Sequence, residues 1–370
     1  ESVQIQRGVG TSANGTSSYA GSINFESINL EKSKAASSIQ FTTGSFGTIR
    51  GGAEVSSGLL DNKTAFYLRY TETHADGYRY NTGTNARSFF FSGGYFGEKH
   101  SFKLTAFNGR SQNGLGYGPV AISDIEADPR TNYVSENDVD DFGQFMTQLQ
   151  HVFEIDDRKK LISTVYYSGA GGDFPFGFTD GNGAFSQINY PLYNDHIGAM
   201  TNFDARFFQN ALHLNMGIHA NRFFRNNVEQ IVPNFSDPYY NDNTRKDELS
   251  GFVKANYSLK KFDFFGDVQL RGVNLLFFPD HDFLGGYTPI PDRNWLFLNT
   301  SGGVTYTINQ KLNTYVSFGR TGREPTRFDI LGSTQINPFN VPIAQDVNQV
   351  VPEYVNDLEA GIRWHSEKLA

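Results

Sequence analysis

The sequence has no cysteine and no apolar run that approaches the roughly 20 residues of a membrane-spanning helix. Without cysteine the protein forms no disulfide, no thiolate zinc site and no cysteine nucleophile. The net charge of -8 at pH 7 argues against a nucleic-acid partner. The GxSxG, HExxH, Walker A and EF-hand patterns are all missing. The sequence therefore predicts neither an enzyme nor a bound cofactor.

The residues that are abundant favour strands and turns. Aromatic side chains make up 15% of the chain, with 34 phenylalanines and 19 tyrosines, and there are 38 glycines. Aromatic residues are enriched in strands, and glycine is common in turns. The mean hydropathy of -0.45 is polar. A polar average is compatible with a membrane barrel, because half of each strand in such a barrel faces a polar lumen.

Apolar and polar residues alternate with a period of two, most clearly in residues 211–222, 249–259 and 296–308. This period predicts strands with one apolar and one polar face, and a membrane-spanning strand needs about 9–11 residues. We expect the following residues to point outward to lipid: Leu212, Leu214, Ile218, Leu249, Val253, Leu296, Leu298 and Ile308. We expect the following residues to point inward to a lumen: Asn215, His219, Lys254, Asn256, Ser301 and Thr305.

The pattern predicts about fourteen strands, joined by connections of alternating length. Short turns such as Asp61–Lys63 and Lys260–Lys261 alternate with long segments. The long segments are residues 110–141, 169–196, 225–245, 277–294 and 319–354. Short turns on one side and long loops on the other are typical of outer-membrane barrels. A soluble β-sandwich also has alternating strands, but it rarely combines long strands with this alternation of connections.

The two tryptophans lie near the ends of predicted strands. Trp295 begins a strand that follows a long connection, and Trp364 lies near the end of the last strand. Aromatic belts occupy these two levels in membrane barrels. The alternative is that both side chains are ordinary packing residues.

Three segments carry a resemblance to a known family. Val3 to Phe25 contains a strand, the pair Arg7-Gly8, a turn rich in glycine and serine, and a second strand. FGRTGREPT, from Phe318 to Thr326, is followed by PEYVNDLEAG, from Pro352 to Gly361. In this order the segments resemble TonB-dependent outer-membrane receptors, plugged β-barrels that import scarce nutrients. The wording QRGVGTSANG is most similar to receptors of the Bacteroidetes type.

The resemblance implies an all-β fold, an antiparallel transmembrane β-barrel of about 22 strands around a plug domain. Residues 1–29 are expected to be the C-terminal end of the plug, and residues 30–370 the N-terminal part of the barrel. The remaining strands and most of the plug are then outside this sequence. The implied location is the outer membrane of a Gram-negative bacterium. The implied partners are outer-membrane lipid, a small nutrient ligand such as an iron chelate, and TonB, through an N-terminal segment outside this sequence.

Within this family the resemblance favours TonB-coupled active import of a ferric siderophore, while a vitamin or glycan cargo stays open. A passive porin or binding barrel is the second reading. A porin has no reason to carry residues 3–25 before its first strand, which favours the receptor. A soluble β-sandwich binding module is the third reading.

The resemblance also suggests site residues. It implies a charged lock between plug and barrel, and we expect Arg7 to pair with Glu359. Two alternatives stay open: a partner on a strand outside this sequence, and a pairing of Glu359 with Arg363 or other lumen residues. The turn residues Gly10, Thr11, Ser12 and Asn14 are candidate ligand contacts, with a plain tight turn as the alternative. Phe174, Phe176 and Phe178 are candidates in a glycine-rich loop, with loop packing as the alternative.

No metal site is predicted. Asp280-His281-Asp282 has competent ligands, but three adjacent residues rarely converge on one ion. Asp237, Asp242, Asp247 and Glu248 are expected to form an acidic loop, but their irregular spacing does not favour a calcium site. His213 and His219 are six residues apart on one strand face, about 20 Å, which is too far to chelate one ion.

Overall fold

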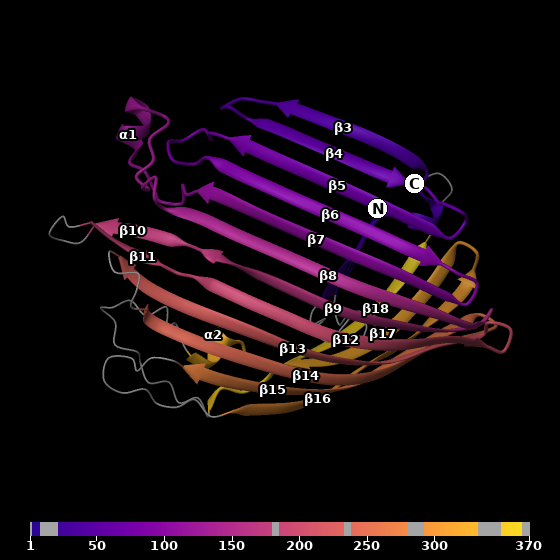
Figure 1. Cartoon of the computed structure of the whole chain (residues 1–370). Helices are drawn as coiled ribbons and strands as arrows, with labels where there is room; N and C mark the ends of the chain where they lie inside the picture. Colours follow the sequence, from indigo (N-terminus) through magenta and orange to yellow (C-terminus); the bar gives the residue numbers. More distant parts are fainter. Residues whose placement is uncertain are drawn as a thin grey trace.

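The computed structural model describes residues 2–7, 21–179, 185–232, 238–279, 292–331 and 349–364 (Figure 1). Almost all regular structure in these ranges is β-strand. The helical pieces are short, namely η2 (Leu30–Lys32), α1 (Ile122–Ala127) and α2 (Arg327–Leu331). In the described ranges, no helix has the length and apolar character that crossing a membrane would demand.

Fourteen strands form one antiparallel meander in which sequence neighbours pair. In order they are β3 (Ala35–Thr43), β4 (Ile49–Ser57), β5 (Thr64–Ala75), β6 (Thr84–Phe96), β7 (His100–Gly114), β8 (Val139–Asp156), β9 (Lys159–Asp173), β12 (Leu192–Phe207), β13 (Leu212–Val232), β14 (Pro238–Leu259), β15 (Phe262–Pro279), β16 (Arg293–Asn309), β17 (Leu312–Arg323) and β18 (Glu353–Trp364). The hairpin of β10 (Pro175–Thr179) and β11 (Phe185–Asn189) joins the end of β13. Strands β3 and β18 are the two edges and do not pair, so the sheet is an open meander with the predicted number of strands.

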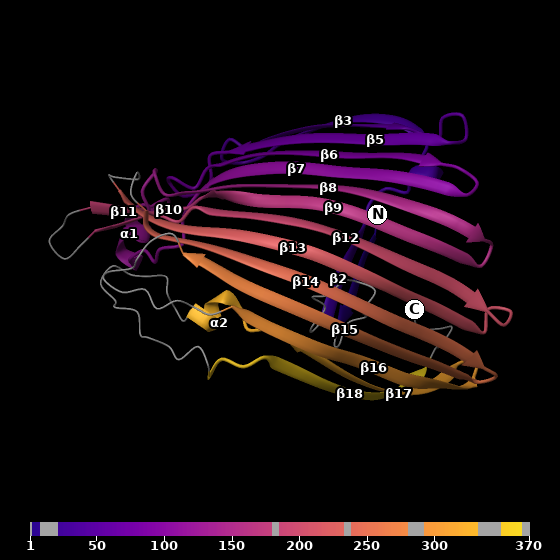
Figure 2. The same cartoon turned by 60° about the horizontal axis from the view of Figure 1, so that its bottom comes forward.

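The sheet curves like part of a cylinder wall (Figures 1 and 2). A separate hairpin of β1 (Ser2–Arg7) and β2 (Gly21–Glu26) lies on the concave side of this wall (Figure 2). The chain after β2 contacts the wall, because the Lys103 ammonium of β7 donates a hydrogen bond to Ser27 Oγ at 3.3 Å. Residues 2–7 and 21–30 therefore lie inside the curve and are not added to its edge.

Short turns gather at one end of the strands, and α1, α2 and the β10–β11 hairpin gather at the other (Figure 1). Asp61, Asn62, Asn210 and Lys260 in the short turns have positive φ, which asparagine and aspartate tolerate better than most residues. The predicted loop at residues 225–245 is wrong, because β13 continues to Val232 and β14 begins at Pro238. Long strands here extend the wall past the membrane-crossing length.

The alternation of faces follows the sequence pattern. On the convex side Ile218, Leu249 and Leu296 are 62%, 60% and 70% exposed. On the concave side Ser250 and Arg271, which are direct cross-strand partners, are 4% and 2% exposed. Apolar side chains thus face outward and polar side chains are buried, the reverse of a soluble sandwich.

Two small apolar clusters lie on the concave side. Leu30 of η2 packs against Ala65 and Tyr67 of β5. At the other end, Ile330 of α2 packs against Leu275 and Phe277 of β15, with Trp295 beside them. Trp295 is therefore a packing residue and not part of an outer aromatic belt, whereas Trp364 is 65% exposed.

Candidate functional site

A network of buried charges lies on the concave face near the middle of β14 and β15. Arg271 of β15 binds Glu248 of β14 at 2.6 Å and Glu324, just after β17, at 2.9 Å. The side chains of Arg271 and Glu248 are 3% and 1% exposed. Lys246 of β14 binds the other Glu324 oxygen at 3.2 Å. Two carboxylates and two cations thus balance one another away from water, which buried charges require.

The segment around Glu324 belongs to the motif that the sequence singled out, and each of its residues has a definite contact. The Gly322 backbone N–H donates to Asn299 Oδ1 at 2.9 Å. A Cβ on Gly322 would come within 2.9 Å of the Phe297 and Tyr354 rings. Thr326 and Asp329 cap α2 reciprocally, since the Thr326 hydroxyl accepts from the Asp329 N–H and the Asp329 carboxylate accepts from the Thr326 N–H. The motif therefore anchors the chain after β17 to the concave wall.

Burial alone would raise the pKa of the Glu324 carboxyl. The charges of Arg271 and Lys246 outweigh burial and hold its pKa below the ordinary value. Glu324 is therefore ionised at neutral pH and keeps both cations engaged.

A pocket of about 310 Å³ opens next to this network. Its charged lining is mostly cationic, with one carboxylate, Glu324, against five cations: Arg225, Lys246, Arg271, Arg323 and Arg327. Glu248 and Glu353 also bind Arg271 and Arg323 from outside the lining. Among the described residues, the Nε atom of the buried Arg271 side chain has no hydrogen-bond partner. The pocket is thus suited to an anionic group.

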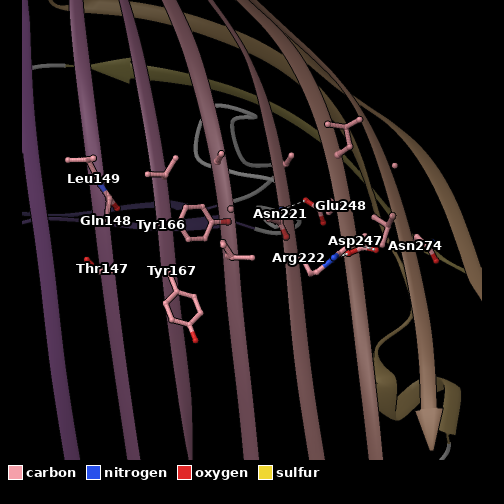
Figure 3. A pocket seen from close by; sticks show the side chains of 18 of the residues that line it. Thr147, Gln148, Leu149, Tyr166, Tyr167, Asn221, Arg222, Asp247, Glu248 and Asn274 are labelled. Carbon is pink, nitrogen blue, oxygen red and sulfur yellow. Dashed lines mark hydrogen bonds and ion pairs between the residues drawn. The ribbon is translucent and has the colours of Figure 1, made fainter.

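A row of polar side chains continues across the wall from Glu248. The Tyr166 hydroxyl lies 3.2 Å from His196 Nε2 and 3.0 Å from His219 Nε2. Asn221 links His196 to Glu248, with contacts of 3.2 and 3.5 Å. Figure 3 shows Tyr166 on β9, Asn221 on β13 and Glu248 on β14. His213 has a different partner, Asp204, at 2.6 Å, so the two histidines of β13 act separately.

The structure reaches only some of the predicted site residues. Glu359 lies on the concave face of β18 opposite Ser317, where it is exposed. Arg7 ends β1, and its side chain lies outside the described part of the structure, so the lock stays a prediction. Gly10, Thr11, Ser12 and Asn14 also lie outside the described residues.

The phenylalanine loop is partly described. Phe174 is 37% exposed, whereas Phe176 in β10 lies against the Tyr117 ring, with centroids 5.3 Å apart. The side chain of Phe178 is not described. Phe176 thus makes the loop-packing contact that was the alternative reading, and a role in ligand binding stays untested for all three.

Metal-binding groups do not gather in the described ranges, where no cluster of three or more His, Cys, Asp or Glu side chains could hold an ion. Asp280, His281 and Asp282 lie outside those ranges. The acidic segment is not a loop, because Asp247 and Glu248 lie in β14 and point to opposite faces.

Sequence reasoning did not predict the ion pairs that Arg271 forms with Glu248 and Glu324. The alternation that placed Lys254 inward also places Glu248 inward, and an inward charge near midstrand needs a partner. The pairing of Glu248 with a cation could therefore have been predicted from the sequence. The contact between Arg271 and Glu324 could not, because it depends on the fold of the chain after β17.

The chain resembles solved outer-membrane receptors at low sequence identity. It matches the siderophore receptor PiuA from Acinetobacter baumannii with a TM-score of 0.79 and 12% identity, over 98% of this chain and 59% of that one. The ferric-catecholate import receptor Fiu from K12 E. coli matches with a TM-score of 0.74 and 16% identity, over 93% and 57%. The copper transporter OprC matches with a TM-score of 0.76 and 14% identity, over 99% and 56%.

These structures support the fold, and the chain spans little more than half their length. Among curated protein sequences, none matches the chain. The family model described as TonB dependent receptor-like, beta-barrel, matches residues 84–370, which is most of the chain. Proteins of this family are transport receptors and not enzymes. The chain therefore belongs to the TonB-dependent receptors, and its curved sheet is part of a transmembrane β-barrel in the outer membrane of a Gram-negative bacterium.

Proposed function

We propose that this receptor imports an anionic iron chelate, such as a ferric siderophore, by TonB-coupled active transport. Residues 1–29 are the end of the plug and residues 30–370 are the first part of the barrel wall. TonB acts through a plug segment outside this sequence. The ligand enters from the side that carries α1, α2 and the β10–β11 hairpin.

The observation that carries the proposal is the cationic pocket beside Arg271. Five of its lining residues are cations and one is a carboxylate, and it opens on the concave face toward the loop end of the wall. Guanidinium groups bind carboxylate and other anionic oxygens through paired hydrogen bonds. Ferric chelates built from carboxylates or catecholates carry such oxygens. The similar structures named for ferric catecholate and siderophore uptake support the same class.

A passive porin is the alternative of another class. The β1–β2 hairpin inside the curve of the wall favours a plugged receptor, because it fills space that a porin would leave for diffusion. Vitamin and glycan cargoes are alternatives within the same class. A neutral cargo has no use for a pocket lined by five cations.

Uptake by a strain that lacks the chromosomal receptor tests the proposal. Cells that carry the receptor are given a radiolabelled ferric catecholate, ferric citrate, cyanocobalamin or a maltodextrin. We expect uptake of a ferric chelate alone, and loss of that uptake when a proton uncoupler removes the energy supply. Uptake that persists with the uncoupler would favour a porin. Uptake of cobalamin or maltodextrin would show that the cargo is a vitamin or a glycan and not a ferric chelate.

The pocket is tested in the same assay. Lys246→Gln should weaken ferric-chelate uptake because it removes one cation from the lining. Arg206→Gln is the matched control, since Arg206 is an exposed cation near the opposite end of the wall. Equal uptake by the two variants would show that the pocket does not bind the imported chelate.

A further inference from the structure

The convex surface carries a shallow furrow of about 930 Å³ that the import function does not use. One row of cross-strand neighbours runs along it from β9 to β15: Val165, Ala199, Ala220, Leu249 and Gly272. Three of these five residues, Ala199, Ala220 and Gly272, have a methyl side chain or none. The furrow exists because the small residues leave space between the larger apolar ones on either side.

A polar row lies directly beside the apolar one, one step toward the loop end of the strands. Arg222 of β13 pairs with Asp247 of β14, and Asp247 with Asn274 of β15, which in turn pairs with Asn294 of β16. All four belong to the furrow lining. Two consecutive rows thus change from apolar to charged within about 7 Å along the strands. This change marks the level at which hydrocarbon gives way to lipid headgroups.

Two arginines share one carboxylate at this level. Arg222 Nε lies 2.5 Å from one Asp247 oxygen, and Arg245 Nε lies 3.1 Å from the other. The Arg222 side chain is 48% exposed, and Figure 3 shows it beside Asp247. The cluster therefore holds one positive charge in excess, on the surface that faces lipid.

We propose that this furrow binds a phosphate-bearing anionic lipid of the surrounding membrane. The lipid phosphate accepts hydrogen bonds from Arg222 and Arg245, and one acyl chain lies over Ala199 and Ala220. Guanidinium groups match phosphate oxygens in geometry and charge. Moving an acyl chain from bulk lipid into the furrow yields little free energy from the hydrophobic effect, because bulk lipid and the furrow are both apolar. Selectivity for the lipid therefore comes from the headgroup, while the furrow supplies close packing for the chain.

The test is a lipid-retention measurement on the receptor in nanodiscs and by native mass spectrometry. Phosphatidylglycerol and phosphatidylcholine of the same acyl length are the probes, since they share the phosphate and differ in net charge. We expect the wild type to retain phosphatidylglycerol in preference. Arg222→Gln should weaken that binding about fivefold, the effect of removing one arginine from an anionic lipid surface. Asp247→Asn should strengthen it, because the excess charge rises.

Ala220→Trp fills the furrow without a change in charge and should also reduce retention. Arg206→Gln, at the far end of the strands, should leave retention unchanged. The proposal is overturned if the two lipids are retained equally, or if Arg222→Gln and Asp247→Asn shift retention in the same direction. A preference that survives Arg222→Gln but is lost in Arg206→Gln would place the lipid elsewhere.

Discussion

Arg271 and Glu248 form an ion pair of 2.6 Å in which the side chains are only 3% and 1% exposed. Arg271 also binds Glu324, which lies beyond the end of β17. A single guanidinium thus joins two strands of the barrel wall to the chain that leads into α2. The pair bears on both folding and the shape of the cationic pocket.

Loss of Arg271 should destabilise the receptor strongly. Arg271→Met would leave Glu248 and Glu324 facing each other without their shared cation, and removing one partner of a buried pair costs about 3–5 kcal/mol. Chemical unfolding in detergent micelles measures this free energy. Arg110→Gln is the control, since the Arg110–Asp141 pair has a 54% exposed arginine and such pairs contribute about 0–1 kcal/mol. Equal losses in the two variants would contradict a structural role for the buried network.

A methyl group at Gly322 should also be costly. The added Cβ would meet the Tyr354 ring at 2.7 Å and the Phe297 ring at 2.8 Å, and overpacking of this kind costs about 1–3 kcal/mol. Gly266→Ala is the matched control, because nothing lies within 4 Å of a Cβ there. Thermal unfolding of the two variants should therefore differ, and a Gly322→Ala protein as stable as Gly266→Ala would count against the close packing.

The sequence predicted the wall better than it predicted the site. Alternation alone placed Ile218 and Leu249 outward and His219 inward, because a strand repeats its faces every two residues. It failed at residues 225–245, where polar side chains suggested a loop. Strands that extend beyond the membrane carry polar residues on both faces, so their composition resembles that of a loop. The prediction that Trp295 belongs to an aromatic belt is wrong, because its packing partner Ile330 comes from α2, which is distant in the sequence.

Acidic pH should loosen the chain after β17. The folded pKa of Glu324 lies below the ordinary value of 4.5, as Arg271 and Lys246 outweigh the effect of burial. The pair therefore contributes stability at neutral pH, and that contribution is lost as the pH falls below about 4.5 through the folded pKa. Unfolding free energies of wild type and Glu324→Gln should differ at pH 7 and converge below this window. A difference that stays constant with pH would show that the charge of Glu324 is not responsible.

A charge on the lipid-facing side should be unfavourable in a depth-dependent way. Ile218 is 62% exposed on the convex face. Ile218→Arg should cost about 2–4 kcal/mol if the residue lies near the bilayer midplane, and about 0–1 kcal/mol near an interface. Phe224→Arg, on the same face of β13 but closer to the loop end, is the depth control and should cost less. Refolding into bilayers gives both values, and a cost near zero at Ile218 would contradict an outward, midplane position.

The last prediction concerns how the plug is held against the wall. Glu359 lies on the concave face of β18, and Arg7 ends the first strand of the hairpin inside the curve. A lumen charge partly dehydrated by the plug needs an opposite partner, so we expect the two side chains to form an ion pair, directly or through one water. Such a pair would resist plug movement until energy is supplied.

A double-mutant cycle measures this coupling. Arg7→Ala and Glu359→Ala should each raise the accessibility of a cysteine introduced in the plug turn, and each should slow transport. If Arg7 and Glu359 are in contact, the double variant should change accessibility and transport little more than either single variant, because the second substitution removes no further interaction. Glu359→Ala combined with Arg363→Ala tests the other partner in the same way, since Arg363 shares the face of Glu359 and lies 4.5 Å from the Tyr315 ring centroid. Additive effects in the first cycle and coupling in the second would assign Glu359 to the wall itself, and the plug would then be held by other charges.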